Sequence, residues 1–350
     1  MSDNLSEWKV RAGDWRATIK SNQRHTVFVI VSFIVIYMIV GLVIDLSLYA
    51  NQYPHATLSQ IFWGLITFKI TPIATIIACI IAVISILVAL VFHDKLMLLG
   101  SEYREITGET AQNLTEKQLF NVVEEMMVAA GLEFMPKVYL IEAEYMNAFA
   151  SGYSEKSAMV AITRGLIEKL DRDELTAVMA HELSHIRHLD IKLTLMASVL
   201  SNITLILIDV LFWNMMFSGG NNDRGDDKKN NQLFIIIMVL RYVLPLLTVV
   251  LMMYLSRVRE YMADAGCVEL MRNNEPLARA LLKIQNDHED NKTQYAAAYS
   301  ATPHESIRRQ AYIFDPVVAG IEAHRSISDM FSTHPSVEQR LKAMGIQKQG

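Results

Sequence analysis

Cysteine is almost absent from this chain of 350 residues, which contains only Cys79 and Cys267. Two distant cysteines cannot form a disulfide framework, and they cannot supply the thiolates of a structural zinc site. A bound metal would therefore be held by histidine and carboxylate side chains. An excess of positive charge is also missing, since the net charge is −5, and this argues against nucleic acid as the main partner.

Two long stretches contain no charged residue at all. Residues 27–44 form one apolar run, which ends at Asp45, and residues 73–92 form another, which follows Pro72. Each is long enough to cross about 30 Å of hydrocarbon as a helix. Both runs are apolar all round, which disfavours buried core helices. The first is too long for the apolar region of a cleavable signal peptide.

Two later apolar runs each carry a charged residue. Residues 193–217 include Asp209, and residues 233–255 include Arg241. We expect both runs to span the membrane, and a helical hairpin packed on a soluble domain is the alternative. An ionisable group inside a span usually faces a partner. We therefore predict that Asp209 and Arg241 pair with each other.

Positive charge is scarce between the first two spans. Lys69 is the only lysine or arginine in residues 45–71, whereas residues 1–26 contain five. By the positive-inside rule, the amino-terminal segment and the chain after residue 92 are expected in the cytoplasm. The predicted order is a cytoplasmic segment (1–26), two spans with a short extracytoplasmic loop (27–92), the first part of a soluble domain (93–192), two further hydrophobic helices (193–255) and the second part of that domain (256–350).

The residues His181-Glu182-Leu183-Ser184-His185 fit the pattern H-E-x-x-H, whose chemistry depends on a helical backbone. Asp171 and Glu174 have the spacing of a capping box, and residues 171–190 contain no proline or glycine, so we expect a helix there. Both imidazoles then share one face and can bind a zinc ion. Glu182 can take a proton from a water bound to that zinc, which is the chemistry of a peptide-bond hydrolase. Such a short pattern also arises by chance, so its interpretation depends on the rest of the chain.

The third metal ligand has two candidates. Glu260 and Asp264 follow the fourth apolar run and are four residues apart, so they share a helix face. Glu260 can complete the ligand set, and Asp264 can accept the N–H of a ligating histidine; a solvated acidic face is the alternative. Two membrane crossings separate His185 from Glu260 and leave both on the same side. His188 is the competing ligand, but a single helical turn offers poor geometry for three imidazoles on one ion.

Short strands precede the motif helix. Residues 137–141 and 158–162 are rich in β-branched and apolar residues, which favours strands. An earlier helix is predicted to start at Thr115, which forms a capping box with Gln118. The segment at Asn147 would lie at a sheet edge, where unpaired backbone groups can bind an extended substrate. A plain hairpin is the alternative for that segment.

The carboxyl-terminal part is polar and largely helical. Residues 336–344 are predicted to form a helix. On the residues alone, His334 is one of ten histidines and Arg340 is a surface charge. We expect the polar stretch 287–328 to act as a lid.

In their order and spacing, these elements resemble the HtpX family of membrane-bound zinc metallopeptidases, relatives of the CAAX prenyl proteases. The resemblance rests on the first two spans, the segment 147–150, the H-E-x-x-H motif, the segment 256–265, and Thr333-His334-Pro335 with Arg340. It implies a mainly α membrane protein, with transmembrane helices and a zincin-like α+β metallopeptidase domain that contains a small β-sheet.

The resemblance also implies roles for single residues. One zinc ion per chain would be bound by His181, His185 and Glu260, with Glu182 as the general base. Asn147 would lie on the substrate-binding edge strand. His334 would approach the zinc or the oxyanion, and Arg340 would hold it there. The stretch 287–328 is longer than the family pattern requires.

The implied activity is cleavage of damaged or misassembled membrane proteins at the bacterial inner membrane, with the active site facing the cytoplasm. Expected partners are membrane-protein substrates, the lipid bilayer and other quality-control proteases. One alternative is a catalytically inactive scaffold or adaptor, against which an intact Glu182 argues. A metal transporter is the other, but charged residues flank the motif and place it outside the hydrocarbon.

Overall fold

The computed structural model describes residues 8–10, 14–98, 102–152, 154–218, 227–301, 311–321 and 334–348. The chain divides into two compact units. The sheet unit consists of Met1–Thr26, Leu90–Thr194 and Met253–Gly350, and the helical unit consists of Val27–Ala89 and Leu195–Met252. Each unit is therefore assembled from segments that are far apart in the sequence.

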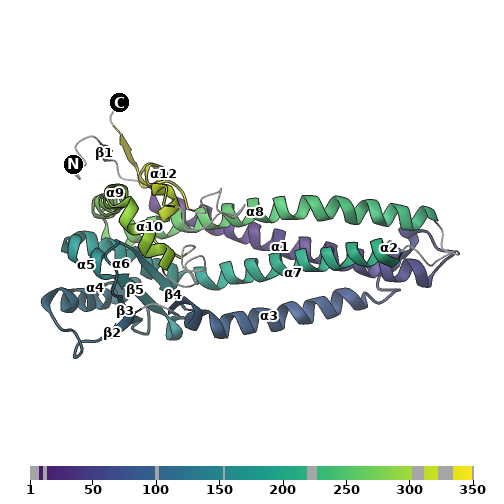
Figure 1. The fold of residues 1–350 in the computed structure, drawn as a ribbon, viewed down its shortest axis with the longest axis horizontal. Helices are drawn as coiled ribbons and strands as arrows, with labels where there is room; N and C mark the ends of the chain where they lie inside the picture. Colours follow the sequence, from purple (N-terminus) through teal and green to yellow (C-terminus); the bar gives the residue numbers. More distant parts are fainter. Residues whose placement is uncertain are drawn as a thin grey trace. The chain divides into compact units, whose positions relative to one another are not determined.

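Helices account for most of both units (Figure 1). In chain order they are α1 (Trp15–Gln52), α2 (Leu58–Ile66), α3 (Ile73–Leu98), α4 (Leu114–Ala130), α5 (Arg164–Lys169), α6 (Arg172–Arg187), α7 (Asp190–Ser218), α8 (Asp227–Met271), α9 (Glu275–Asp290), α10 (Lys292–Ala301) and α12 (Val337–Ala343). The strands are β1 (Trp8–Val10), β2 (Tyr103–Ile106), β3 (Lys137–Ile141), β4 (Ala148–Ser151), β5 (Met159–Thr163) and β6 (Ile346–Lys348). This confirms the expectation of a mainly α protein with a small β-sheet.

The four-stranded sheet has the order β2-β3-β5-β4. β3 and β5 are parallel, with Tyr139 opposite Ala161, whereas β2 and β4 run antiparallel to their neighbours. Every residue of β4 and β5 is buried, and α6 packs against β4 and α4. The motif helix therefore lies beside the strand at the sheet edge. A separate antiparallel pair joins β1 to β6.

Helix α4 starts earlier than the predicted capping box at Thr115. Asn113 is its N-cap, and the Asn113 Oδ1 atom accepts the amide of Glu116 at 2.8 Å. Glu116 is buried and pairs with Arg104 at 2.7 Å and with Arg164 at 3.3 Å. The predicted start was wrong because these two long-range ion pairs fix Glu116, and with it the first helical turn.

Helix α6 begins as the sequence predicts. Asp171 accepts the amide of Glu174 at 2.8 Å, and the Glu174 carboxylate accepts the amide of Asp171 at 3.0 Å. The helix ends at Arg187, before the predicted limit at Asp190, because Leu189 adopts a left-handed conformation with φ 53°. Helix α7 begins after this turn, at Asp190.

The helical unit is held together by apolar contacts and by one buried carboxylate. Its buried cluster includes Leu46 of α1, Leu65 of α2 and Leu233 of α8. Asp45 is fully buried, and its carboxylate accepts the amide of Thr75 at 2.9 Å in the first turn of α3. Residues 45–71, which were expected to form a loop, contain the end of α1 and all of α2.

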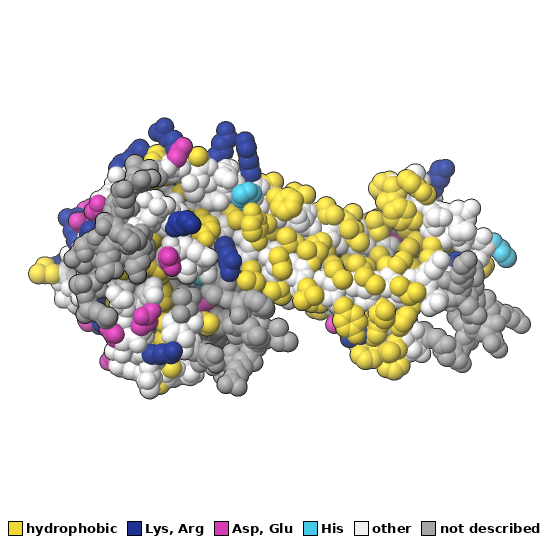
Figure 2. Space-filling model, turned by 90° about the horizontal axis from the view of Figure 1, so that it is seen from above, with side chains coloured by type: hydrophobic (Ala, Val, Ile, Leu, Met, Phe, Trp, Pro, Cys, Tyr) yellow, Lys and Arg dark blue, Asp and Glu magenta, His cyan; other side chains and the backbone are white. Residues whose placement is uncertain are grey.

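Three helices in the described parts of the chain are long and apolar enough to cross a membrane. They lie within Trp15–Gln52, Asp190–Phe217 and Lys229–Met271, and Ile73–Ala89 is a shorter apolar helix. Hydrophobic side chains cover most of the helical unit's visible surface in Figure 2. A surface of this kind is suited to lipid rather than to water. A complete second span at residues 73–92 stays a prediction.

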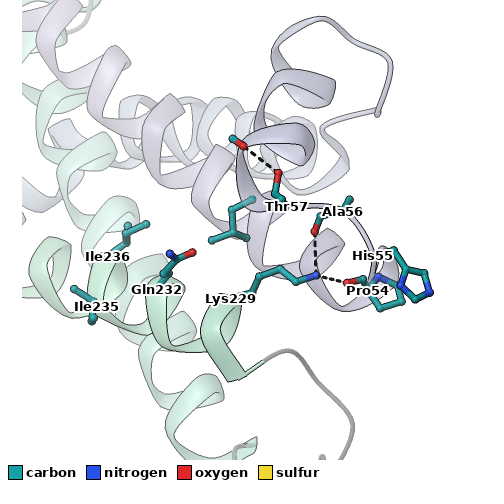
Figure 3. Close-up of a pocket in the computed structure, with 10 residues that line it drawn as sticks. Pro54, His55, Ala56, Thr57, Lys229, Gln232, Ile235 and Ile236 are labelled. Carbon is teal, nitrogen blue, oxygen red and sulfur yellow. Dashed lines mark hydrogen bonds between the residues drawn. The ribbon is translucent and has the colours of Figure 1, made fainter.

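A cavity of about 700 Å³ lies in the helical unit, between the segment 54–59 and the start of α8 (Figure 3). Lys229 beside it is buried, and its Nζ donates to the carbonyl oxygens of Pro54 at 2.6 Å, Ala56 at 3.0 Å and Tyr53 at 3.3 Å. These contacts account for all three ammonium donors. Lys229 therefore ties α8 to the segment between α1 and α2 and has no remaining donor for a ligand.

Candidate metal centre

Helix α6 and the last part of α8 bring the three predicted ligands together in the sheet unit. The Nε2 atoms of His181 and His185 are 3.2 Å apart. Glu260 Oε2 lies 3.6 Å from His181 Nε2, and Glu260 Oε1 lies 3.5 Å from His185 Nε2. All three side chains are buried. Among the described residues, this is the one group of three such side chains with ligand atoms within 4.8 Å of one another.

These separations fit a metal ion. Donor atoms at about 2.0–2.1 Å from a tetrahedral zinc lie about 3.3–3.4 Å from each other, close to the 3.2 Å between the two Nε2 atoms. Each Nε2 atom also lies within 3.6 Å of one of the two Glu260 oxygens. Glu260 Oε2 is a buried oxygen without a hydrogen-bond partner in the described part of the chain, and a cation would satisfy it. Two imidazoles and one carboxylate are also an established donor set for a three-ligand zinc site.

A buried carboxylate orients each imidazole. Asp264 Oδ1 lies 3.0 Å from Nδ1 of His181, and Asp190 Oδ2 lies 2.7 Å from Nδ1 of His185. When the carboxylate accepts Nδ1–H, the Nε2 lone pair is directed toward a metal. Sequence reasoning placed Asp264 in this role but missed Asp190. The available signal was an acidic residue directly after the motif helix.

A metal must displace a proton from His181. Burial and the charge of Arg340 lower the pKa of His181, but the carboxylates of Asp264 and Glu260 outweigh them and raise it to about 9. Histidine binds a metal only when the coordinating nitrogen is deprotonated, so metal binding at neutral pH releases this proton.

Glu182 lies between the two histidines in the sequence and is 1% exposed. Burial raises the pKa of its carboxyl group, although His181 and His185 oppose the shift. Its Oε2 atom has no hydrogen-bond partner among the described residues. A buried carboxylate oxygen with a raised pKa is suited to accept a proton from a bound molecule.

The carboxyl-terminal residues His334 and Arg340 also lie at this centre. Arg340 is 2% exposed, donates to the Asp264 carboxylate at 2.6 Å and 3.0 Å, and lies 3.4 Å from Glu260 Oε2. His334 Nε2 is 3.7 Å from Glu260 Oε1. The reading of Arg340 as a surface charge is therefore wrong, because a tertiary contact with Asp264 buries it.

His188 does not join the ligand group. Its Nδ1 atom lies 2.8 Å from the carbonyl oxygen of Ser184, at the end of α6. Glu260 instead completes the group because α8 passes close to α6. At Gly266, an added Cβ atom would lie only 2.0 Å from Ser184 Oγ, so this approach requires glycine.

The Asn147 side chain contacts carboxyl-terminal segments of the sheet unit. It is fully buried and donates to Tyr299 Oη at 3.1 Å and to the carbonyl oxygen of Phe314 at 3.0 Å. Next to it, the amide of Ile313 donates to the carbonyl oxygen of Ala148 at 2.9 Å. The β4 edge that we expected to be open is therefore occupied at this point. Unpaired edge groups are readily satisfied by another segment of the same chain.

The stretch 287–328, predicted to be a lid, is described only in part, because residues 302–310 and 322–328 lie outside the described residues. Its first part is packed into the sheet unit. Tyr295 of α10 is buried, and its hydroxyl donates to Asp287 at 2.7 Å. Deleting the whole stretch would therefore remove buried side chains, and a lid role needs a smaller perturbation to test it.

Comparison with known proteins agrees with this geometry. The profile of Peptidase family M48 matches residues 113–346, a range that includes the whole ligand group. A protein of Helicobacter pylori (strain Shi470) named Protease HtpX homolog is 40% identical over 327 residues, which cover 93% of this chain and 96% of that protein. The chain belongs to the HtpX group of peptidase family M48. A Protease HtpX homolog of Listeria monocytogenes serotype 4a (strain HCC23) is 34% identical over 334 residues, covering 93% of this chain and 97% of that protein.

Membership of this family has direct consequences. This M48 peptidase is a membrane protease that hydrolyses peptide bonds, and its family implies a metal, for which His181, His185 and Glu260 are the available ligands. The crystal structure of S. mikatae Ste24p is also similar, with a TM-score of 0.45 and 20% sequence identity, over 77% of this chain and 57% of that chain.

Proposed function

We propose that this M48 peptidase is a zinc-dependent endopeptidase that cleaves damaged or misassembled membrane proteins at the cytoplasmic face of the bacterial inner membrane. The observation that carries the proposal is the convergence of His181, His185 and Glu260, with both Nδ1 atoms held by carboxylates. Glu182 adds a buried oxygen that has no hydrogen-bond partner among the described residues.

His181, His185 and Glu260 would hold one zinc ion, and Asp264 and Asp190 would fix the two imidazoles. Bound zinc would supply a Lewis acid for the scissile carbonyl and would lower the pKa of the attacking water. Glu182 Oε2 accepts the proton of that water and passes it to the amine that leaves.

The motif helix precedes Glu260 in the sequence, whereas His334 and Arg340 follow it. Both of these later residues reach the ligand group. We assign to His334 the stabilisation of negative charge on the scissile carbonyl oxygen, and to Arg340 a positioning role. His334 can donate to that oxygen, and Arg340 keeps Asp264 in place through its two hydrogen bonds.

An extended substrate would add to the outer side of β4 and would bring its scissile bond to the zinc ligands. It would have to displace Ile313 from Ala148, whose carbonyl oxygen accepts the Ile313 amide. Ile313→Pro removes that competing N–H. We expect this variant to start cleaving casein faster than the wild type, and a correctly folded variant with an unchanged initial rate would argue against the displacement.

The first test measures bound zinc per chain and casein digestion in detergent for the wild type, Glu182→Gln and Glu260→Gln. We expect Glu182→Gln to keep zinc and lose cleavage, and Glu260→Gln to lose zinc. Glu269→Gln, also on α8, is the control and should behave like the wild type. Equal zinc in all four proteins would remove Glu260 from the ligand set. Cleavage by Glu182→Gln at the wild-type rate would remove Glu182 as the base.

The cytoplasmic orientation rests on the distribution of charge, since residues 1–26 carry five lysine or arginine residues and residues 45–71 carry one. His55 is exposed in the segment between α1 and α2. A cysteine placed there in a cysteine-free variant should react with an impermeant maleimide from the periplasmic side of the inner membrane. Reaction only after the membrane is opened would reverse the proposed orientation.

A further inference from the structure

The predicted pair of Asp209 and Arg241 is present in the helical unit, but its two members differ in exposure. Arg241 Nε lies 2.9 Å from Asp209 Oδ1. The Arg241 guanidinium lies 4.0 Å from the ring centroid of Phe212 and 5.3 Å from that of Trp213, and its side chain is 25% exposed. The Asp209 side chain is 54% exposed. Arg241 is therefore largely covered by its neighbours, whereas the Asp209 carboxylate is exposed at the surface of the helical unit.

This acidic surface lies deep within a helix that is long and apolar enough to span a membrane. Asp209 is nine residues before the end of α7 at Ser218, which is about 13 Å along the helix axis. Arg241 is twelve residues after Lys229, or about 18 Å along α8. In a hydrocarbon layer of about 30 Å, both positions are near mid-depth. Ionisable side chains at such depth normally face protein or water rather than lipid.

Asp209 belongs to a continuous stripe on α7. Asn202, Ile206, Asp209 and Trp213 are spaced by four, three and four residues, so they share one face. All four are exposed, Ile206 by 61% and Trp213 by 46%. We name these four residues the α7 stripe. A spacing of three and four residues is that of the seam between two packed helices, and polar side chains on such a seam form hydrogen bonds across it.

We propose that the α7 stripe docks a transmembrane helix of a substrate that carries an unpaired hydrogen-bond donor near the middle of its span. A carboxylate has about four acceptor sites, and the contact with Arg241 leaves others for a donor on an incoming helix.

A substrate helix of this kind also predicts which membrane proteins the peptidase would select. A polar side chain within a span is normally paired inside an assembled bundle or complex, and it loses its partner when assembly fails. The α7 stripe would therefore distinguish unassembled from assembled membrane proteins by the chemistry of the exposed span. The inference rests on the proposed function, because it supplies substrates to the same metal centre.

The test compares two single-span substrates in proteoliposomes. They share one cytoplasmic tail with a cleavage site and differ only at mid-span, where one has leucine and the other asparagine. We expect the wild type to cleave the asparagine substrate with a KM about 3- to 10-fold lower, which is the range of one hydrogen bond between membrane helices. Equal KM values for the two substrates would overturn the proposal.

The enzyme variant must remove both charges, because a single change would leave an unpaired charge in the span. Replacing an ion pair with apolar residues is often neutral for stability, so the double variant Asp209→Leu with Arg241→Leu is suited to the test. It should cut casein as the wild type does but lose its preference for the asparagine substrate. Tyr242→Leu, at a position that is 68% exposed, is the control and should keep the preference. A double variant that keeps the preference would refute docking at the α7 stripe.

A photoreactive residue at Val210 identifies the occupant directly. Val210 is 62% exposed and follows Asp209. Adducts with the asparagine substrate are expected, and adducts only with a second copy of the enzyme would replace the proposal with self-association. Failure of the wild type to cut casein would count against the proposed function itself, whereas casein cleavage without substrate preference would count only against the α7 stripe.

Discussion

Asp190 offers the sharpest test of how the metal centre is built. Its carboxylate is fully buried and lies 2.7 Å from Nδ1 of His185, while its other oxygen is 3.5 Å from Arg259 Nε. Removing such a partner of a metal-bound histidine typically lowers metal affinity by about 10- to 100-fold. We therefore expect Asp190→Ala to lose about 1.4–2.8 kcal/mol of zinc-binding free energy. Asp190→Asn keeps an acceptor but not the charge, so its loss should lie at the lower end of that range.

The assay is competition for zinc between the detergent-solubilised protein and a chromogenic chelator at neutral pH. Two controls separate the histidine contact from other effects. Asp173→Asn changes an exposed carboxylate on α6 and should bind zinc like the wild type. Arg259→Gln removes the second neighbour of Asp190 but leaves its contact with His185, so it should lose less zinc affinity than Asp190→Ala. The reasoning is refuted if folded Asp190→Ala binds zinc with wild-type affinity, or if Arg259→Gln loses as much affinity as Asp190→Ala.

Three further changes probe the sheet unit. Arg340→Met removes the guanidinium and both of its hydrogen bonds from the buried Asp264 carboxylate, so it should destabilise the unit by about 3–5 kcal/mol, measured by thermal unfolding; an unchanged melting temperature would contradict this. Gly266→Ala places a Cβ atom 2.0 Å from Ser184 Oγ and should cost about 1–3 kcal/mol, with partial recovery when Ser184→Ala is added. No recovery would place the strain elsewhere. Burial alone would raise the pKa of Glu116, but hydrogen bonds from two arginines lower it overall, so its stabilising effect is present above its usual pKa of 4.5 and is lost as the pH falls below that value. Glu116→Gln should flatten this acid dependence in unfolding curves, and an unchanged slope would count against the ion pairs.

Long-range contacts explain where prediction from local patterns was wrong. The start of α4 moved to Asn113 because Glu116 pairs with Arg104 and with Arg164, and the second pairing joins residues that are 48 apart in the sequence. The open edge expected at Asn147 is occupied because Ile313 reaches Ala148. In both cases a distant segment of the chain supplies a hydrogen-bond or ion-pair partner for a polar group, and the local sequence pattern does not specify that partner.

The sequence by itself determined the ligand pair, the helix that presents it and the apolar spans. His181 and His185 share a face because a helix repeats every 3.6 residues, Asp171 caps that helix through a residue three positions away, and a span depends only on its length and polarity. Only the tertiary structure decided that Asp190 holds His185 and that Arg340 is buried against Asp264, 76 residues away in the sequence. Contacts of this kind depend on how helices turn and pack, and no local period specifies which distant side chain fills the space beside a buried charge.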